Sequence, residues 1–388
     1  MLAPYSFQLF ANPNAGTPGI VVLPAGGFRR AKAEITSWPG YAPTPLRDLP
    51  KIAQAAGVGV VRLKDEAPRF GLGSFKALGG AYAVANLLRD ELARRGVALS
   101  ASSADLLAGT WREATAGITV TSATDGNHGR SVAWGAQRFG CRAVIFVHET
   151  VSQSRIDAIA AYGAEVRVVP GTYDDAVRET DRMAKAEGWQ VVSDTSWPGY
   201  TEVPRDVMQG YRLMADEALD QWELPSPTHV FIQGGVGGAA ASVSVQMRAR
   251  ISPAPALVVV EPEHASCLLA SAETGALTAV PGNLDTLMAG LACGEPSLLA
   301  WQELDRAAAA FMAIPDVAAV DCMKLLAKQG IVAGESGVAG LAGFLLAAAD
   351  PAARETLGLG PDSRVLLFNT EGATDPALYE QLVGHPAG

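Results

Sequence analysis

"VGVVRLKDEAPRFGLGSFKALGGAY", residues 58 to 82, contains a short apolar run, a glycine-punctuated loop and the start of a helical pattern. Residues 58 to 66 are typical of a buried strand, and residues 74 to 96 of an amphipathic helix. Between them, Lys76 stands between an aromatic side chain and several very small residues. A strand that leads through a glycine loop into a helix is typical of α/β proteins, so this stretch predicts that class.

The same alternation continues along the chain. A strand is predicted at 117–124 and a helix at 129–140. Further short apolar strands, each ending in glycine or a polar residue, are predicted at 142–149, 164–171, 189–194, 229–235, 256–263 and 363–372. This pattern predicts an α/β fold with buried, mostly parallel sheets flanked by helices. Such sheets bind ligands beyond the carboxyl ends of their strands, so we expect the chemistry there.

Composition excludes several classes of protein. The chain has 388 residues, of which 49% are hydrophobic and 18% charged, so it can form two domains with cores and is not disordered. Its net charge of -10 argues against a nucleic-acid partner. The longest nearly apolar stretch, residues 337–349, is too short to cross a bilayer and predicts a buried helix. We therefore expect a small-molecule ligand and no membrane partner.

The cysteines and histidines indicate neither a disulfide scaffold nor a metal site. The four cysteines form no CxxC motif, and the five histidines form no HExxH motif. The first ten residues lack the pattern of a secretory signal, so a cytoplasmic location is expected. Cys267 and Cys293 could pair, but cytosolic thiols are normally reduced, so we expect free cysteines.

The loop after the first strand makes Lys76 a candidate nucleophile. A lysine attacks an aldehyde only when burial or a neighbouring cation lowers its pKa. The small residues that follow Lys76 would leave room for a flat cofactor. Most lysines in the first turn of a helix are nevertheless solvated, so the residue type alone does not decide the role.

A second loop, between a predicted strand and a helix, contains Gly234, Gly235, Val236, Gly237 and Gly238. Glycines allow backbone N–H groups to converge on an anion, and a helix start adds a favourable dipole. The loop lacks the Lys-Ser/Thr of a P-loop and fits the dinucleotide fingerprint poorly. It predicts a phosphate-binding loop, with a plain tight turn as the alternative.

Two more strands end in polar residues. Asp125 and Asn127 stand between a strand and a helix, where either could cap the helix. Asn369 and Thr370 follow the last strand and could hydrogen-bond a ring nitrogen, although turn chemistry would also explain them. Together the four segments match the separate parts of pyridoxal phosphate: its aldehyde, phosphate, phenolic oxygen and ring nitrogen.

The order of four motifs, "SFK", "DGNHG", "GGVGG" and "GESG", followed by a Ser/Thr-type residue after the last strand, resembles the fold-type II pyridoxal-phosphate enzymes. The tryptophan synthase β-subunit and threonine dehydratase belong to this group, and the resemblance covers nearly the whole chain. More specific strings are similar to the diaminopropionate ammonia-lyase family. They are "WPGYAPTPL" (38–46), "SDTSWPGY" (193–200), "MQGY" (208–211), "AGLACGEPS" (289–297) and "NTEGATDP" (369–376).

The resemblance implies a role for each cofactor-binding residue. Lys76 matches the lysine that forms an imine with the cofactor, and Phe75 would flank the cofactor. Asn127 matches the residue that hydrogen-bonds the phenolic oxygen. Thr370, or with weaker support Asn369, would face the pyridine nitrogen. The phosphate loop corresponds to Gly234, Gly235, Val236, Gly237 and Gly238, and the "GESG" loop that approaches the cofactor to Gly334, Glu335 and Ser336.

The implied reaction is the α,β-elimination of 2,3-diaminopropionate to pyruvate and two ammonia. The amine of Lys76 would take the α-proton while the cofactor ring accepts charge. Asp125 and Asp194 match acidic positions of the ammonia-lyase, and a carboxylate would hold the protonated β-amine and keep it charged. Asp125 could also act as a base on the face opposite Lys76, which would allow turnover of both the D and the L isomer. Without the family match, a turn-stabilising role for Asp194 is equally reasonable.

Other functions remain as alternatives at this point. Within the same fold, a serine or threonine dehydratase is the nearest, although those enzymes usually have a small residue where this chain has Asp125. A dinucleotide-dependent oxidoreductase would explain the alternating strands but not Lys76 or the late position of the glycine loop. A non-catalytic binding protein with a degenerate site is a third alternative.

The expected architecture has two domains with the cofactor in the cleft. A large domain would combine residues 1–88 and 208–388, and a smaller mobile domain would comprise residues 89–207. Domain closure would exclude water from the reacting complex. A homodimer is expected, because such pairs are common in this group and are the commonest oligomers generally.

Overall fold

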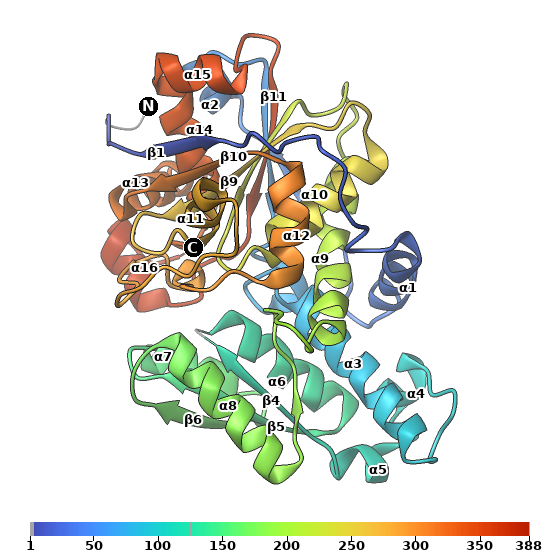
Figure 1. Ribbon diagram of the computed structural model, residues 1–388. Helices are drawn as coiled ribbons and strands as arrows, with labels where there is room; N and C mark the ends of the chain where they lie inside the picture. The colour runs from blue at the N-terminus through green and yellow to red at the C-terminus, as the bar shows by residue number, and fades with distance from the viewer. Residues whose placement is uncertain (1–3, 125, 388) are drawn as a thin grey trace. The chain divides into compact units, whose positions relative to one another are not determined.

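The computed structural model describes residues 4–124 and 126–387 (Figure 1). The chain falls into two compact units. The first comprises the residues up to Pro24, Ala42–Phe75 and the residues from Arg212 onward, and the second comprises Ala25–Tyr41 and Lys76–Tyr211. One of the boundaries between the two units therefore lies between Phe75 and Lys76, directly before the candidate nucleophile. The domain limits at 88/89 and 207/208 stay a prediction.

The first unit is built on a seven-stranded sheet with the order β1-β10-β9-β8-β11-β3-β2. Its strands are β1 (Gln8–Ala11), β2 (Leu46–Asp48), β3 (Val60–Asp65), β8 (His229–Gln233), β9 (Ala256–Pro262), β10 (Ala308–Ile314) and β11 (Arg364–Asn369). The five central strands are parallel, whereas β1 and β2 pair antiparallel at the two edges. The expected α/β fold with mostly parallel sheets is confirmed.

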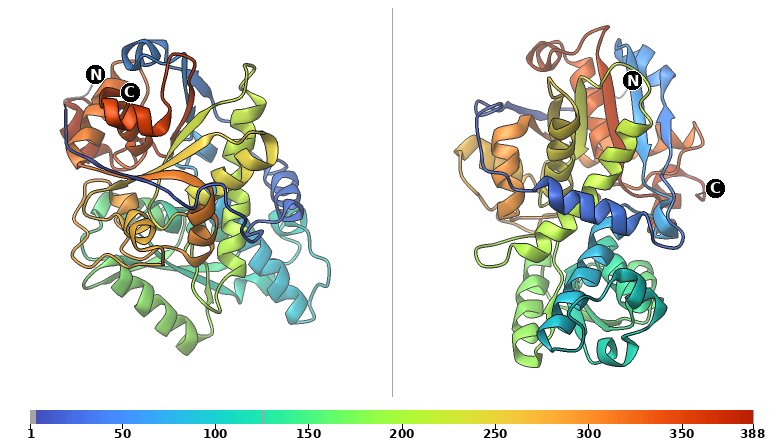
Figure 2. Two further views of the ribbon diagram at one scale, coloured as in Figure 1. Left: turned by 45° about the horizontal axis from the view of Figure 1, so that its top comes forward. Right: turned by 90° about the vertical axis from the view of Figure 1, so that its right-hand side faces the viewer.

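Helices complete this unit. They are α2 (Pro50–Ala56), α10 (Gly238–Arg250), α11 (Cys267–Thr274), α12 (Leu298–Ala307), α13 (Asp316–Ala327), α14 (Ala339–Ala349), α15 (Pro351–Leu357) and α16 (Pro376–Val383), with short 3₁₀ turns at Arg69–Gly71 and Ala289–Leu291. The strand order reverses direction between β10 and β11, so right-handed connections place α14 on the opposite face from α10 and α12 (Figure 1). The edge strand β1, dark blue, is also visible in Figure 2.

Helix α14 is the buried helix predicted from the apolar run at 337–349, and this prediction is confirmed. It packs against strands β8 to β11. A Cβ atom at Gly340 would lie 2.7 Å from Phe231 O, and one at Gly343 would lie 2.6 Å from Val260 Cγ2. The two glycines therefore allow the helix to approach the sheet closely. Within the described residues, no helix is long and apolar enough to span a membrane.

The second unit contains a parallel four-stranded sheet with the order β6-β5-β4-β7. Its strands are β4 (Thr119–Thr124), β5 (Arg142–His148), β6 (Glu165–Val169) and β7 (Gln190–Val191), and its helices are α1 (Ala25–Ile35), α3 (Ala77–Arg94), α4 (Ser103–Ala108), α5 (Arg112–Ala116), α6 (Asn127–Phe139), α7 (Gln153–Ala160) and α8 (Tyr173–Glu187). Helix α9 (Glu202–Asp220) continues from this unit into the first.

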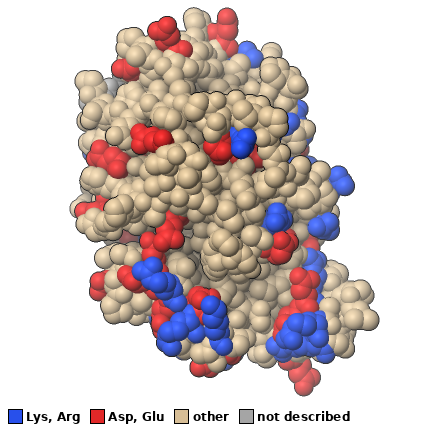
Figure 3. Space-filling view, in the orientation of Figure 1, with Lys and Arg blue, Asp and Glu red and all other residues tan. Residues whose placement is uncertain are grey.

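Charges on the visible face of the second unit are mixed. Basic groups of α8 lie beside acidic ones (Figure 3). They form pairs one turn apart, Arg178 with Asp175 and Lys185 with Asp181, at 2.8 and 2.6 Å. Such exposed pairs contribute little stability.

Candidate active site

Lys76 is the residue directly before helix α3, and its ammonium contacts a carboxylate. Lys76 Nζ lies 2.5 Å from Asp194 Oδ2, and both side chains are largely buried, with exposures of 19% and 9%. Asp194 follows β7, 118 residues further along the chain. The structure therefore pairs two residues that were both predicted as parts of the site.

The small residues after Lys76 have a different role from the one expected. A Cβ atom at Gly79 would lie 2.4 Å from the Tyr211 ring, and one at Gly80 would lie 2.3 Å from Ser131 Oγ. Ser131 Oγ in turn donates to Lys76 O at 2.8 Å. The space in front of these glycines is thus filled by neighbouring helices, so the glycines fix the position of Lys76 rather than leave room for a cofactor.

Asp194 is held as an anion by its neighbours. Burial by itself would raise the pKa of Asp194, but His128 and Lys76 nearby outweigh it and hold that pKa well below its ordinary value. His128 Nδ1 lies 3.8 Å from Asp194 Oδ2, while its Nε2 lies 2.9 Å from Val192 O. The site therefore contains a buried carboxylate that stays ionised across the physiological pH range and can bind a cationic group.

The turn around Asp194 is stabilised by other side chains. The hydroxyl of Tyr200 donates to Val191 O at 2.8 Å and accepts from Ser193 N at 3.1 Å. The Tyr200 ring also stacks on Trp197, with ring centroids 4.4 Å apart. Ser193 and Tyr200 thus provide turn-stabilising hydrogen bonds, while Asp194 Oδ2 faces the lysine.

Asn127 is the first residue of α6, where the sequence predicts a contact with the cofactor's phenolic oxygen. The start of this helix is capped by a residue that the sequence reasoning missed, because Thr124 Oγ1 accepts from Gly126 N at 2.9 Å and Gly129 N at 3.0 Å. Asp125, the other predicted acidic residue, lies outside the described residues.

The glycine loop in the first unit connects β8 to α10 and requires glycine. Gly235 and Gly237 have φ angles of +60° and +95°. A Cβ atom at Gly234 would lie 2.6 Å from Glu261 Cγ, and one at Gly237 would lie 2.9 Å from Ala300 Cβ. A residue with a side chain at Gly234 or Gly237 would therefore clash with these neighbours unless the backbone moved.

The same loop fits a phosphate group. Helix α10 begins at Gly238 without a side-chain cap. Among the described residues, the N–H groups of Gly235, Val236 and Gly238 have no hydrogen-bond acceptor. Free backbone donors at a helix start favour an anion. This geometry is compatible with the predicted phosphate-binding role of the loop, which stays a prediction.

Glu335 and its neighbours form a turn that is hydrogen-bonded to the segment after β11. Ser336 N donates to Glu371 Oε1 at 3.0 Å, and Ser336 Oγ accepts from Gly290 N at 3.0 Å. Gly334 N donates to Glu371 O at 2.9 Å. These contacts are structural, and Glu335 itself is buried, with 2% exposure.

The two candidates for the ring nitrogen differ in what their side chains already bind. Asn369 Nδ2 donates to Asp65 Oδ1 at 2.9 Å and to Val332 O at 3.1 Å, so its amide protons are used within the protein. The Thr370 hydroxyl accepts from Gln233 Nε2 at 2.9 Å. Phe75 N donates to Thr370 O at 3.1 Å, which connects the residue before Lys76 to the end of β11. Only Thr370 keeps a proton to donate.

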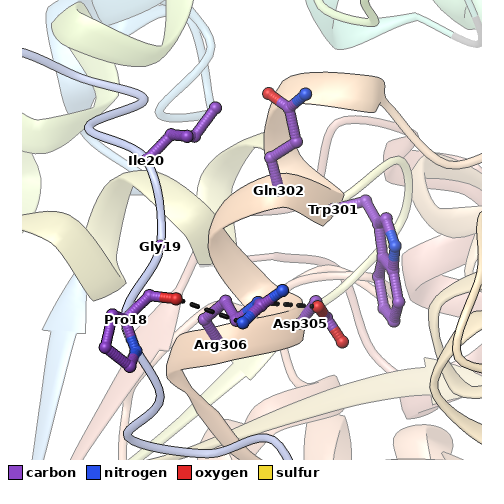
Figure 4. Close-up of a pocket in the computed structure, with 7 residues that line it drawn as sticks. All are labelled: Pro18, Gly19, Ile20, Trp301, Gln302, Asp305 and Arg306. Atoms are coloured by element: carbon purple, nitrogen blue, oxygen red, sulfur yellow. Dashed lines mark hydrogen bonds and ion pairs between the residues drawn. The ribbon is translucent and has the colours of Figure 1, made fainter.

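One cavity lies elsewhere in the first unit. It has a volume of about 470 Å³ and is lined by Pro18, Gly19, Ile20, Trp301, Gln302, Asp305 and Arg306 (Figure 4). Arg306 spans it by donating to Pro18 O at 3.1 Å. It contains none of the predicted site residues, so it does not change the assignment of the site. Among the described residues, no cluster of His, Cys, Asp and Glu could hold a metal ion.

Comparison with known proteins decides the family. Residues 37–371 match the family model of pyridoxal-phosphate dependent enzymes. The chain belongs to this family. It is 41% identical over 355 residues to diaminopropionate ammonia-lyase of Escherichia coli (strain K12), covering 89% of this chain and 88% of that enzyme. The predicted fold-type II architecture and the expected cofactor, pyridoxal phosphate, agree with this result.

Solved structures of this family give the same result. A crystal structure of holo diaminopropionate ammonia lyase from Escherichia coli covers 99% of this chain and 98% of its own, with a TM-score of 0.89 and 37% identity. The same enzyme in complex with an aminoacrylate-PLP azomethine reaction intermediate has a TM-score of 0.87 and 36% identity, covering 98% of this chain and 97% of its own.

Proposed function

We propose that this protein is a diaminopropionate ammonia-lyase that converts 2,3-diaminopropionate to pyruvate and two ammonia. The observation that carries the proposal is the buried contact between Lys76 and Asp194, found in a chain that is 41% identical to a diaminopropionate ammonia-lyase over nearly its full length. The first residue supplies the reactive amine. The second supplies a fixed negative charge at the same place.

The cofactor-binding roles follow from the residues that remain available. When bound, pyridoxal phosphate supplies an aldehyde that reacts with amines and a conjugated ring that accepts electron density from the α-carbon. Gly234, Gly235, Val236, Gly237 and Gly238 would hold its phosphate through backbone N–H groups. The remaining cofactor contacts that we propose are Phe75 at its face, Asn127 at the phenolic oxygen, Thr370 at the ring nitrogen and Glu335 near the ring.

Lys76 and Asp194 would divide the proton chemistry. With cofactor and substrate bound, the free amine of Lys76 would take the α-proton. Asp194 then lacks its cationic partner and can bind the β-ammonium of the substrate. A positively charged β-amine leaves as ammonia, whereas the hydroxyl of serine or threonine offers the carboxylate no charge to pair with. The unsaturated amino acid that results takes up water and yields pyruvate and the second ammonia.

Asp125 completes the proposal. We assign it as a second acidic residue that acts on the face opposite Lys76 and allows both the D and the L isomer to react. The assignment rests on the motif "DGNHG". It stays a prediction, as do the other individual site assignments.

A substrate panel tests the proposed function. We expect pyruvate release from 2,3-diaminopropionate to be faster than from serine or threonine, and the Lys76→Ala variant to lose it by about 10²- to 10⁴-fold, because the general base is removed. Lys185, which is 76% exposed in a surface ion pair, is the matched control, and Lys185→Ala should keep full activity.

Two results would contradict the proposal. Faster pyruvate or oxobutyrate release from serine or threonine would favour the dehydratase alternative. Unchanged turnover in Lys76→Ala would exclude this lysine as the reactive amine.

We further propose that the protein works as a homodimer in the cytoplasm and that the predicted domain limits mark a mobile region. Closed symmetric pairs are the commonest oligomers, which supports the first assignment. The position of Lys76 at the start of a separate compact unit supports the third.

A further inference from the structure

Gln233 is a buried polar residue that the mechanism above does not use. It is the last residue of β8, directly before the glycine loop, and is 2% exposed. Its Nε2 lies 2.7 Å from Gly337 O, 2.9 Å from Phe368 O and 2.9 Å from Thr370 Oγ1. One amide group thus joins the end of β8, the end of β11 and the turn before α14.

The surroundings determine which end of the amide faces these atoms. Two of the three neighbours are backbone carbonyl oxygens, which can only accept hydrogen bonds. An amide oxygen in the same place would repel both of them. The donor nitrogen of Gln233 must therefore face Gly337, Phe368 and Thr370.

This orientation controls the hydroxyl of Thr370. An amide nitrogen has no lone pair to accept a hydrogen bond, so Thr370 cannot donate its proton to Gln233. Among the described residues, no acceptor for the Thr370 hydroxyl proton is present. Gln233 Nε2 has two protons for three acceptor atoms, and however they are shared it cannot accept the Thr370 hydroxyl proton, which is left for another partner.

We propose that Gln233 is a positioning residue that fixes the direction of the Thr370 hydroxyl, so that Thr370 donates to the pyridine nitrogen of the cofactor. This inference rests on the proposed function, which places Thr370 at that nitrogen. A nitrogen that accepts a hydrogen bond from a neutral hydroxyl keeps its lone pair and stays unprotonated. Gln233 thereby limits how strongly the ring withdraws charge, which suits rapid elimination.

The test combines two substitutions in the full protein loaded with ¹⁵N-labelled pyridoxal phosphate. The ¹⁵N resonance of the ring nitrogen reports its hydrogen bond directly. Gln233→Met and Thr370→Val should each shift that resonance toward the position of a pyridine nitrogen without a donor. Each should also weaken cofactor binding by about two- to tenfold, the effect of one neutral hydrogen bond. Thr370→Ser should restore the resonance.

The double variant separates positioning from a purely structural role. If Gln233 acts through the Thr370 hydroxyl, adding Gln233→Met to Thr370→Val will not shift the resonance further. Gln246→Met is the matched control, because Gln246 is also buried and hydrogen-bonds Asp216 through its amide. It should lower the thermal midpoint of the apoprotein and leave the resonance unchanged.

Several outcomes would overturn the inference. A Gln233→Met protein that is less stable but has an unchanged resonance would show a structural role only, as would additive shifts in the double variant. If Gln233→Met does not fold, Gln233→Asn, which withdraws the amide from Thr370, replaces it. An unchanged resonance in Thr370→Val would show that Thr370 does not donate to the ring nitrogen, and would also overturn the inference.

The proposed function is checked separately by cofactor binding and pyruvate release in the unmodified protein. A protein that releases pyruvate but shows no effect of Gln233 on the resonance contradicts only the role of Gln233. A protein that does not bind the cofactor contradicts both.

Discussion

Glu261 is a fully buried carboxyl group beneath the glycine loop. Its two oxygens accept from Leu268 N at 2.9 Å and Leu269 N at 2.8 Å, at the start of α11. Its Cγ occupies the place that a Cβ atom at Gly234 would need. Burial raises the pKa of Glu261 to about 8 despite these hydrogen bonds. A single side chain thus links α11 to the base of the glycine loop.

The raised pKa predicts how stability depends on pH. Between the ordinary carboxyl pKa and about pH 8, the unfolded chain has lost this proton while the folded protein keeps it. The contribution of Glu261 to stability is therefore complete at low pH and declines as pH rises, by at most about 1.4 kcal/mol per pH unit.

Urea unfolding of the unmodified protein and Glu261→Gln, from about pH 5 to about pH 8, measures this effect. Glutamine does not titrate, so the difference in the free energy of unfolding should be largest at the acidic end and shrink towards pH 8. A difference that stays constant would mean that Glu261 has the same charge in the folded and unfolded states.

The start of helix α10 depends on a left-handed backbone conformation in the turn that follows β8. Gly237 precedes α10 with a φ of +95°, and a Cβ atom there would lie 2.9 Å from Ala300 Cβ. Any other residue would have to move the first N–H groups of the helix. These are the groups that we assign to the phosphate.

Gly237→Ala should therefore weaken binding of pyridoxal phosphate by roughly tenfold or more, since strain at such a position costs about 1–3 kcal/mol. A fluorescence titration with the cofactor measures this affinity. Gly275→Ala is the matched control, because Gly275 has a φ of +69° and no atom within 4 Å of its Cβ position. Gly275→Ala should lower stability only. Equal loss of affinity in both variants would argue against the cradle.

A buried ionic cluster contributes to the stability of the whole larger unit. Arg69, in the loop before Phe75, donates to Glu217 Oε1 at 2.8 Å and to Glu66 Oε2 at 2.8 Å. Lys64 Nζ also lies 2.8 Å from Glu217 Oε2. Arg69 is 1% exposed, so these charges are fully removed from water. The cluster holds the loop that leads to Lys76 against α9.

Arg69→Met should lower the free energy of unfolding by about 3–5 kcal/mol, because it leaves buried carboxylates without their partner. Denaturant unfolding measures the change. Arg182→Ala, which breaks an exposed pair with Glu179, should cost less than about 1 kcal/mol. Comparable losses in the two variants would show that the buried cluster contributes no more than a surface pair.

The amino-acid sequence by itself determined the class of fold and several chemically distinct segments. Apolar strands, glycine turns and helix patterns depend on neighbours within a few residues, so β3, β8, β11 and α14 could be predicted. Strand β10 could not, because its run of alanines favours a helix and only pairing with β9 and β1 makes it extended. The family resemblance added the predicted roles of Lys76 and the glycine loop.

Only the tertiary structure decided which of these side chains meet. Lys76 and Asp194 are 118 residues apart, Gln233 and Thr370 are 137 apart, and Arg69 and Glu217 are 148 apart. No local pattern contains such pairings, because they arise when parallel strands and their helices bring distant segments together. The sequence does show Gln233 as a polar residue at the end of an apolar strand. Its partner and the direction of its amide depend on carbonyl oxygens that folding alone places beside it.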